Sequence, residues 1–302
     1  DTMLIAGILK ANRIVTSLNL QGSHMNDACK EAIGQAIMRN AHSKIESMAC
    51  DAWSMADELV VDLSKLALNS ADVVLLAAAV KHNTRLTTLL MPDDYVGDDA
   101  GGLALVDALR VNRTVTRLGD MRPDEMSEAD FSDHAYTLLR VFEKQFFVRR
   151  LEFCTCLSSL ILAHNDMGAS EMIPLSEALK LNSSVTHLDI SGNDLRDYGA
   201  KLFADVLRVS PSIGTLVMKD INVGVEGREA LGRSLLDTDT SPMRGLVCDQ
   251  WSVLHDLESL DLSNEGLTAS NVYLLGAVLS RSCSVKEVVL AHNDLCPKVE
   301  MD

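Results

Sequence analysis

Aromatic residues are scarce in this chain of 302 residues. They make up 4% of the sequence, whereas hydrophobic residues as a whole make up 47%. A core with so few rings must be filled by leucine, valine, isoleucine and alanine. Such a core suits a regular stack of layers, in which each layer reuses the same small set of side chains.

Basic residues are also in short supply. The chain carries 27 lysines and arginines against 43 aspartates and glutamates, a formal net charge of −16. This balance argues against a nucleic-acid partner, because neutralising phosphates requires a basic face. It is compatible with a protein partner that has a basic surface; alternatively, the charge only keeps the protein soluble.

No disulfide framework and no long apolar run can be found. The seven cysteines are odd in number and scattered, which favours reduced thiols in an intracellular, cytoplasmic protein. Without about 18 consecutive apolar residues or a signal-peptide pattern, we expect no membrane span. The first residue is Asp1, so the sequence leaves open whether a leader precedes it.

Catalytic and metal-binding motifs are equally absent. There is no nucleophile elbow, phosphate-binding glycine loop or His-Glu-x-x-His pattern. Cys154-Thr-Cys156 with the nearby His164 lacks the second ligand pair of a zinc site. We therefore expect a protein that is not an enzyme and holds no metal or cofactor.

What the sequence does contain is a repeat, seen most clearly in residues 185–210. Val185 to Ile190 alternate between apolar and polar residues, the period of a strand with one buried face. Asn193 and Gly199 mark a turn, and the apolar residues that follow have helical spacing. One strand and one helix cannot bury their own apolar faces, but a stack of such units can.

The inward strand leucine of this unit has equivalents along the whole chain. Nine strands are predicted, centred on Leu18, Val61, Leu89, Leu118, Leu160, Leu188, Leu216, Leu260 and Val288. Most spacings are 28 or 29 residues, but three are 42 to 44, which places insertions at about 42–58, 123–153 and 237–256. We expect a single array over 1–302. Because neither end has a polar capping repeat, we expect a fragment of a longer chain, or ends covered by another subunit.

The insertions resemble one another. Cys50-Asp-Ala-Trp53-Ser54 and Cys248-Asp-Gln-Trp251-Ser252 are near copies, and Phe153 lies at the corresponding place in the middle insertion. We expect these three aromatics to be structural wedges between insertion and array. The middle insertion also contains a long helix-like stretch from Glu125 to Phe147.

The units Leu-x-x-Leu-x-Leu-x-x-Asn, each followed by a glycine and a long helix, resemble leucine-rich repeats of the ribonuclease-inhibitor-like class. Residues 157–182, 185–210 and 257–282 carry the similarity. The class includes ribonuclease inhibitors, nucleotide-binding immune receptors and the activating protein of the Ran GTPase. The resemblance implies an α/β horseshoe solenoid, with parallel strands on the concave face and helices on the convex face.

In such strands the residues between the leucines face the concave surface. The central outward positions are Asn19, Asp62, Leu90, Gly119, Ile161, Asp189, Val217, Asp261 and Val289. Four of these are aliphatic, and an exposed aliphatic stripe can mark a contact surface. The alternative is that the insertions fold over them. Likewise, the aspartates form either an acidic recognition edge or ordinary repeat chemistry.

Asparagines follow several of the predicted strands. We expect Asn165, Asn193, Asn264 and Asn293 to bond the backbone of neighbouring turns and to form a ladder along the stack.

Taken together, the sequence predicts a non-catalytic interaction or assembly scaffold. Its protein partner would bind the concave face, the insertions, or both. One alternative, implied by the resemblance, is a GTPase-activating module that supplies an arginine such as Arg122 or Arg196, which lie just beyond strands. Another is a permanent structural subunit of a large complex.

Overall fold

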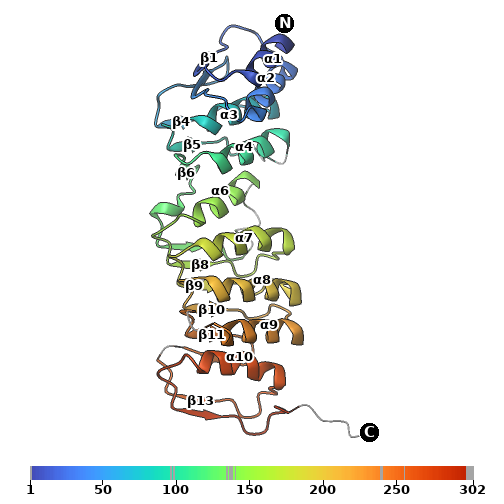
Figure 1. Ribbon diagram of the computed structural model, residues 1–302, viewed down its shortest axis with the longest axis vertical. Coiled ribbons are helices and arrows are strands. Elements are labelled where there is room, and N and C mark those ends of the chain that lie inside the picture. Colours follow the sequence, from blue (N-terminus) through green and yellow to red (C-terminus); the bar gives the residue numbers. More distant parts are fainter. Residues whose placement is uncertain are drawn as a thin grey trace, which may run out of the picture. The chain divides into compact units, whose positions relative to one another are not determined.

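The computed structural model describes residues 2–95, 97, 99–133, 135, 139, 141–238, 241–254 and 256–296. The chain forms two compact units. Unit 1 comprises Asp1–Pro123 and Leu139–Arg150, and unit 2 comprises Asp124–Leu138 and Leu151–Asp302. Within each unit, helices lie on one side and strands on the other (Figure 1).

Unit 1 is built from short strands alternating with helices. Its elements are α1 (Thr2–Ala11), β1 (Ser17–Asn19), α2 (Asp27–Arg39), β2 (Ser47–Ala49), β3 (Ser54–Met55), β4 (Val60–Asp62), α3 (Ser70–His82), β5 (Thr88–Leu90), α4 (Ala100–Val111), β6 (Arg117–Leu118) and most of α6 (Val141–Leu151). The strands form two sheets, in the orders β1-β2-β3 and β4-β5-β6. From α1 to α4, each helix packs against the next.

Unit 2 repeats this arrangement. Its elements are β7 (Glu128–Asp130), β8 (Ser159–Ile161), α7 (Ala169–Leu181), β9 (His187–Asp189), α8 (Arg196–Val209), β10 (Thr215–Val217), α9 (Val225–Leu236), β11 (Gly245–Val247), β12 (Ser252–Val253), β13 (Ser259–Asp261), α10 (Ala269–Leu279) and β14 (Glu287–Val289). Its larger sheet has the order β12-β11-β10-β9-β8-β7, and β13 pairs with β14. From α7 to α10, each helix packs against the next.

All nine predicted strands are confirmed, as β1, β4, β5, β6, β8, β9, β10, β13 and β14. The three insertions contain further strands that the sequence did not predict. β2, β7 and β11 lie within them and pair in parallel with β1, β8 and β10. The longer spacings therefore each contain an extra rung of the sheet as well as a loop.

The expectation of one long helix from Glu125 to Phe147 is wrong. This stretch begins at the end of a 3₁₀ turn (Pro123–Glu125), continues into β7 and reaches α6 only at Val141. Positions 134, 136–138 and 140 of the stretch lie outside the described residues. A strand forms here because Ala129 packs inward while Glu128 and Asp130 remain exposed, which is strand alternation.

The expected asparagine ladder, in the turns that follow the strands, forms at three of its four predicted positions. Asn193 is 1% exposed, and its Nδ2 donates to the carbonyls of Leu162 and Ile190, both at 2.9 Å. Its Oδ1 accepts from the amides of Asn165 and Met167, both at 3.1 Å. Asn165 and Asn293 make equivalent bonds to the backbone of the preceding turn.

Asn264 was wrongly included in this ladder. It is exposed and has a φ of +61°, close to the +65° of Gly192, the residue before Asn193. Asn264 therefore occupies the left-handed position of its turn, which asparagine tolerates. The ladder position in that repeat is occupied by Glu265.

Replacing Gly192 by alanine is expected to lower the free energy of unfolding by about 2 kcal/mol. Its left-handed backbone disfavours a Cβ, and a Cβ built there would overlap the ring of His164 in the neighbouring turn. Gly266→Ala is the matched control, because Gly266 has the same φ of +65° but open space around it. Urea denaturation of both variants separates backbone strain from overlap. Equal losses would contradict a role for the His164 contact.

A second asparagine ladder, which the sequence analysis missed, lies where helices lead into strands. Its members Asn40, Asn83, Asn112 and Asn182 are all buried and follow α2, α3, α4 and α7. Asn112 shows the pattern: its Nδ2 donates to the carbonyls of Val80 and Asn83, at 2.7 and 2.8 Å. In unit 2 asparagines therefore bond neighbouring repeats on both sides of the strands, whereas in unit 1 Asn40, Asn83 and Asn112 do so on the side where helices lead into strands.

Candidate functional site

The largest continuous strand surface lies on the sheet of unit 2. Strand pairing places five outward residues side by side, one from each of β7 to β11. We call this set the strand row: Asp130, Ile161, Asp189, Val217 and Val247. Their inward neighbours, such as Leu160 and Leu188, are fully buried, so the alternation is that of a sheet with one face on the core.

The strand row mixes acidic and aliphatic groups. Asp130 is exposed, and the other four members are half-buried. Two aliphatic side chains, Ile161 and Val217, flank Asp189 directly. Such a surface offers a partner both apolar contact area and negative charge.

The other predicted surface residues lie in smaller groups. In unit 1, Asp62 lies opposite Leu90, and Asn19 lies opposite Ala49. In unit 2, Asp261 lies opposite Val289 on the separate two-stranded sheet. Gly119 lies just beyond the end of β6.

Two members of the strand row, Asp130 and Val247, were missed by the sequence analysis because their strands lie within insertions. The signal was weak but present. Asp130-Phe-Ser132 repeats the spacing of an aspartate and a serine two residues later that also occurs at Asp189 and Asp261.

The aspartates of these strands each make the same kind of hydrogen bond. Each Oδ1 accepts from the backbone amide of the serine two residues later: Ser132 for Asp130 at 2.9 Å, and Ser191 for Asp189 at 2.9 Å. Asp62 and Asp261 make the same bond. Two hydrogen bonds from the same serine lower the pKa of the Asp62, Asp130 and Asp261 carboxyl groups. The bond from the serine hydroxyl has the larger effect, and the bond from the backbone amide has the smaller one.

This bond supports the ordinary repeat chemistry that was one of the two interpretations of these aspartates. A carboxylate has two oxygens, however, and the backbone bond engages one of them. The aspartates can therefore stabilise the turn and still present charge on the sheet.

The hairpin of the third insertion lies at the edge of the sheet. β12 pairs antiparallel with β11 and is the last strand in the sheet order. It thus extends the sheet beyond Val247.

Trp53 and Trp251 occupy equivalent places in two hairpins. Both are buried, at 5% and 4% exposure. Cys50 N donates to Trp53 O at 2.8 Å, and Cys248 N donates to Trp251 O at 2.9 Å. Burial raises the pKa of Cys50, and it raises that of Cys248 to about 11, so both thiols stay protonated at neutral pH.

The expected third copy at Phe153 is wrong. Phe153 follows α6 instead of preceding a hairpin strand, and its side chain is 47% exposed. The middle insertion contains β7 in place of the β2–β3 type of hairpin, so equal spacing from the anchor leucine did not give an equal position.

The cysteine pair singled out in the sequence does not meet His164. Cys154 and Cys156 lie before β8, with their sulfurs 3.8 Å apart, and Cys156 Sγ donates to the carbonyl of Asp124 at 2.7 Å. His164 follows the other end of β8 and packs on Gly192. Over the part of the chain that the structure describes, no three side chains form a metal-ligand group.

The two arginines considered for a GTPase-activating role differ in their surroundings. Arg196, at the start of α8, forms an ion pair with Asp194 at 2.6 Å. That pair lowers the pKa of Asp194 and raises that of Arg196. Arg122 is an exposed residue just before the 3₁₀ turn. Arg122 belongs to unit 1 and Arg196 to unit 2.

Within the described residues, no helix has both the length and the apolar character needed to cross a lipid bilayer. Comparison with protein families matches residues 181–204 to the model described as Leucine Rich repeat. That segment contains the end of α7, β9 and the first turns of α8.

Two groups of relatives are similar over most of the chain. "Capping protein, Arp2/3 and myosin-I linker protein 3" of Rattus norvegicus is 26% identical over 226 residues, covering 75% of this chain and 15% of the relative. "NACHT, LRR and PYD domains-containing protein 14" of Homo sapiens is 28% identical over 233 residues, covering 77% and 16%. The chain thus spans only about a sixth of these relatives' length.

Among solved structures, "Leiomodin-1 Actin-Binding Site 2 (ABS2)" matches with a TM-score of 0.37 and 19% identity. The match covers 42% of this chain and 72% of that one.

Proposed function

Because this chain is a leucine-rich repeat protein of the ribonuclease-inhibitor-like class, we propose that it is a non-catalytic interaction module. It binds a protein partner through the strand row of unit 2. The observation that carries the proposal is the row itself, in which Ile161 and Val217 flank Asp189 in register on a sheet face opposite the helices. Aliphatic groups left partly in water on a regular surface are typical of a contact site.

The proposed partner has a basic surface with apolar residues between its charges. Asp130 and Asp189 present acidic groups on the row, and Glu128 lies beside them on the same face of β7. The lowered pKa of Asp130 keeps its carboxylate charged at neutral pH. Together with the net charge of −16, these groups would speed the approach of a positively charged protein.

The test compares two triple variants in a pull-down from native lysate. Ile161→Asp, Val217→Asp, Val247→Asp changes the three aliphatic members of the strand row. The control, Leu181→Asp, Val209→Asp, Leu236→Asp, adds the same charges at exposed aliphatic positions at the ends of α7, α8 and α9. Circular dichroism first establishes that both variants are folded.

We expect the strand variant to lose at least one partner by more than tenfold while the control keeps it, as quantified by mass spectrometry. That partner, purified, should then bind the wild-type chain directly and bind less tightly as salt is raised. If both variants retain every partner equally, the strand row is not the binding surface.

In that event the next surface to change is α1, whose outer side carries Met3, Leu4 and Ile8 at 78%, 69% and 56% exposure. We propose that a neighbouring subunit or further repeats cover this helix, since such large side chains are seldom left together in water.

A further inference from the structure

The helix α3 is buried over most of its length. Its residues from Ala71 to Val80 are all buried, and apart from Asp72 they are alanine, valine or leucine. A helix that is apolar all round is one that is covered on every side. By contrast, α8 shows the usual pattern, with Lys201, Asp205 and Arg208 exposed along one face.

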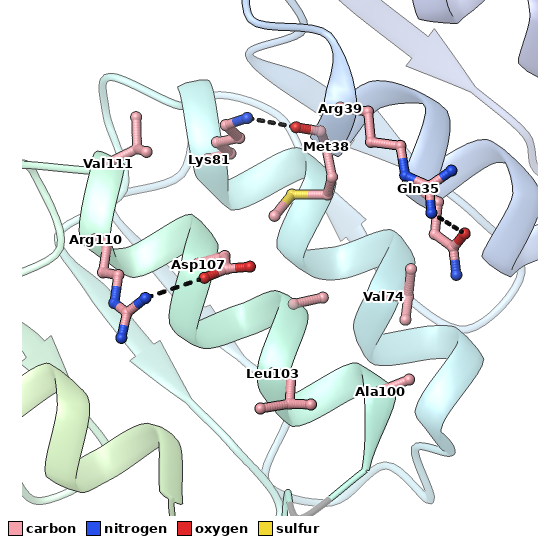
Figure 2. A pocket seen from close by; sticks show the side chains of 11 residues that line it. Gln35, Met38, Arg39, Val74, Lys81, Ala100, Leu103, Asp107, Arg110 and Val111 are labelled. Atoms are coloured by element: carbon pink, nitrogen blue, oxygen red, sulfur yellow. Dashed lines mark hydrogen bonds and ion pairs between the residues drawn. The ribbon is translucent and has the colours of Figure 1, made fainter.

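The helices α2 and α4 both pack closely against α3. A Cβ built on Gly34 of α2 would lie 2.8 Å from Val74 Cγ1, and one on Gly101 of α4 would lie 2.6 Å from the carbonyl of Ser70. Glycine at both contacts lets α2 and α4 approach α3 closely. A hollow lies between α2 and α4, and Val74 and Lys81 of α3 line its floor (Figure 2).

We call this hollow the α2–α4 groove; its volume is about 600 Å³. Its apolar surface is formed by Met38, Val74, Ala100, Leu103, Ala104 and Val111. Leu103 and Val111 remain 59% and 49% exposed, although single exposed aliphatics on a helix are common. Here they line the same groove as the half-buried Met38, while Val74 is a nearly buried residue at its floor.

The charged residues of the groove are mostly basic. Arg39, Lys81 and Arg110 line it, with Asp107 as the one acidic residue among them, in a chain whose net charge is −16. Each cation lies in the last turn of its helix, where it also offsets the helix dipole. The groove therefore has a positive end.

Lys81 lies at the positive end of the groove. Its Nζ donates to the carbonyl of Met38 at 2.6 Å, as Figure 2 shows. Burial lowers the pKa of Lys81. An ammonium has three donor hydrogens and Met38 accepts one, so an acidic group of a ligand would complete its solvation.

We propose that the α2–α4 groove binds an amphipathic α-helix of a partner protein, whose apolar face covers Leu103 and Val111 and whose acidic residues meet Lys81 and Arg110. Apolar anchors at helical spacing set in such a groove are a common mode of peptide recognition. This binding is independent of the strand row.

The test is a selection from a displayed library of amphipathic helical peptides with randomised charges, using the complete chain as bait. We expect enrichment of peptides with apolar residues at i, i+3/i+4 and i+7 and with glutamate or aspartate near one end. Selected peptides, labelled with fluorescein, are then titrated by fluorescence anisotropy against variants of the complete chain.

The variants come in matched pairs. Leu103→Glu changes the groove, and Leu181→Glu changes a similarly exposed leucine on α7, 66% exposed. Arg110→Glu changes the groove, and Arg208→Glu changes an arginine on α8 that has the same i,i+3 pairing with an aspartate. We expect at least a tenfold weaker Kd for each groove variant and less than a twofold change for each control.

Three results would overturn the proposal: no enrichment of acidic amphipathic sequences, equal weakening by the control variants, or unchanged affinity when the acids of a selected peptide become lysine. A fourth would identify a different occupant. If sedimentation shows that the chain self-associates and Leu103→Glu abolishes this, the groove binds a second copy instead.

Discussion

Asn193→Asp is expected to lower the free energy of unfolding by about 3 kcal/mol or more at neutral pH. The substitution preserves shape but turns the Nδ2 donor into an oxygen. That oxygen then faces the carbonyls of Leu162, Ile190 and Ser191, which now accept from Nδ2 at 2.9, 2.9 and 3.1 Å. With Asn193 1% exposed, water cannot take over these bonds.

Urea denaturation followed by circular dichroism measures this loss, and Asn264→Asp is its isosteric control. Asn264 is exposed and in a left-handed conformation that aspartate also accepts, so we expect a change below about 0.5 kcal/mol. The defect of Asn193→Asp should also shrink as pH is lowered. A buried carboxyl has a folded pKa above its unfolded value, so its destabilisation is present above that range and is relieved by protonation. A pH-independent loss would contradict this account.

The second large effect is expected at the ion pair that joins α2 to α3. Lys30 Nζ lies 2.7 Å from Asp72 Oδ1, and the two side chains are only 18% and 6% exposed. Asp72 also completes the cap of α3 by accepting from the amide of Asn69. Asp72→Ala should therefore cost about 3 kcal/mol, because it leaves a half-buried ammonium with the more distant Asp27, at 3.7 Å, and removes half of the capping box of α3.

Two comparisons test the origin of this effect. Glu258→Ala removes an ion pair with Lys286 that is 72% exposed on both sides, and should cost less than about 1 kcal/mol. Lys30→Met combined with Asp72→Ala should regain part of the loss. The pair raises the pKa of Lys30, so its stabilisation is present below the unfolded lysine pKa, about 10.4, and is lost as pH rises through the folded value. If the double variant is no more stable than Asp72→Ala, the whole loss of stability comes from the cap of α3.

The sequence predicts the regular repeats well because their strands carry two strong signals. Leu188 and Ile190 alternate with polar residues, and a helix of clear period follows. The strands inside the first and third insertions lack the second signal. Ser47–Ala49 and Gly245–Val247 are as long as the regular strand His187–Asp189, but each is followed by the second strand of a hairpin and not by a helix. Their pairing depends on the neighbouring strand, which sequence spacing alone does not reveal.

The errors in the candidate site have related causes. Asn264 was placed in the ladder because of its residue type, whereas Glu265 occupies that register position. Phe153 was matched by counting from an anchor, across an insertion of different structure. The α2–α4 groove could not be predicted at all, because its lining comes from three helices, α2, α3 and α4, whose packing sequence spacing alone does not reveal.

The hydrogen bond from Ser191 N to Asp189, and its equivalent from Ser132 N to Asp130, affect more than the turns that they close. Each bond orients its aspartate on the sheet before any partner arrives. A carboxylate that is already oriented loses less conformational entropy on association, so more of its interaction with a cationic group is expressed as affinity. The two aspartates of the strand row would therefore act as preorganised anions, with Ile161 between them.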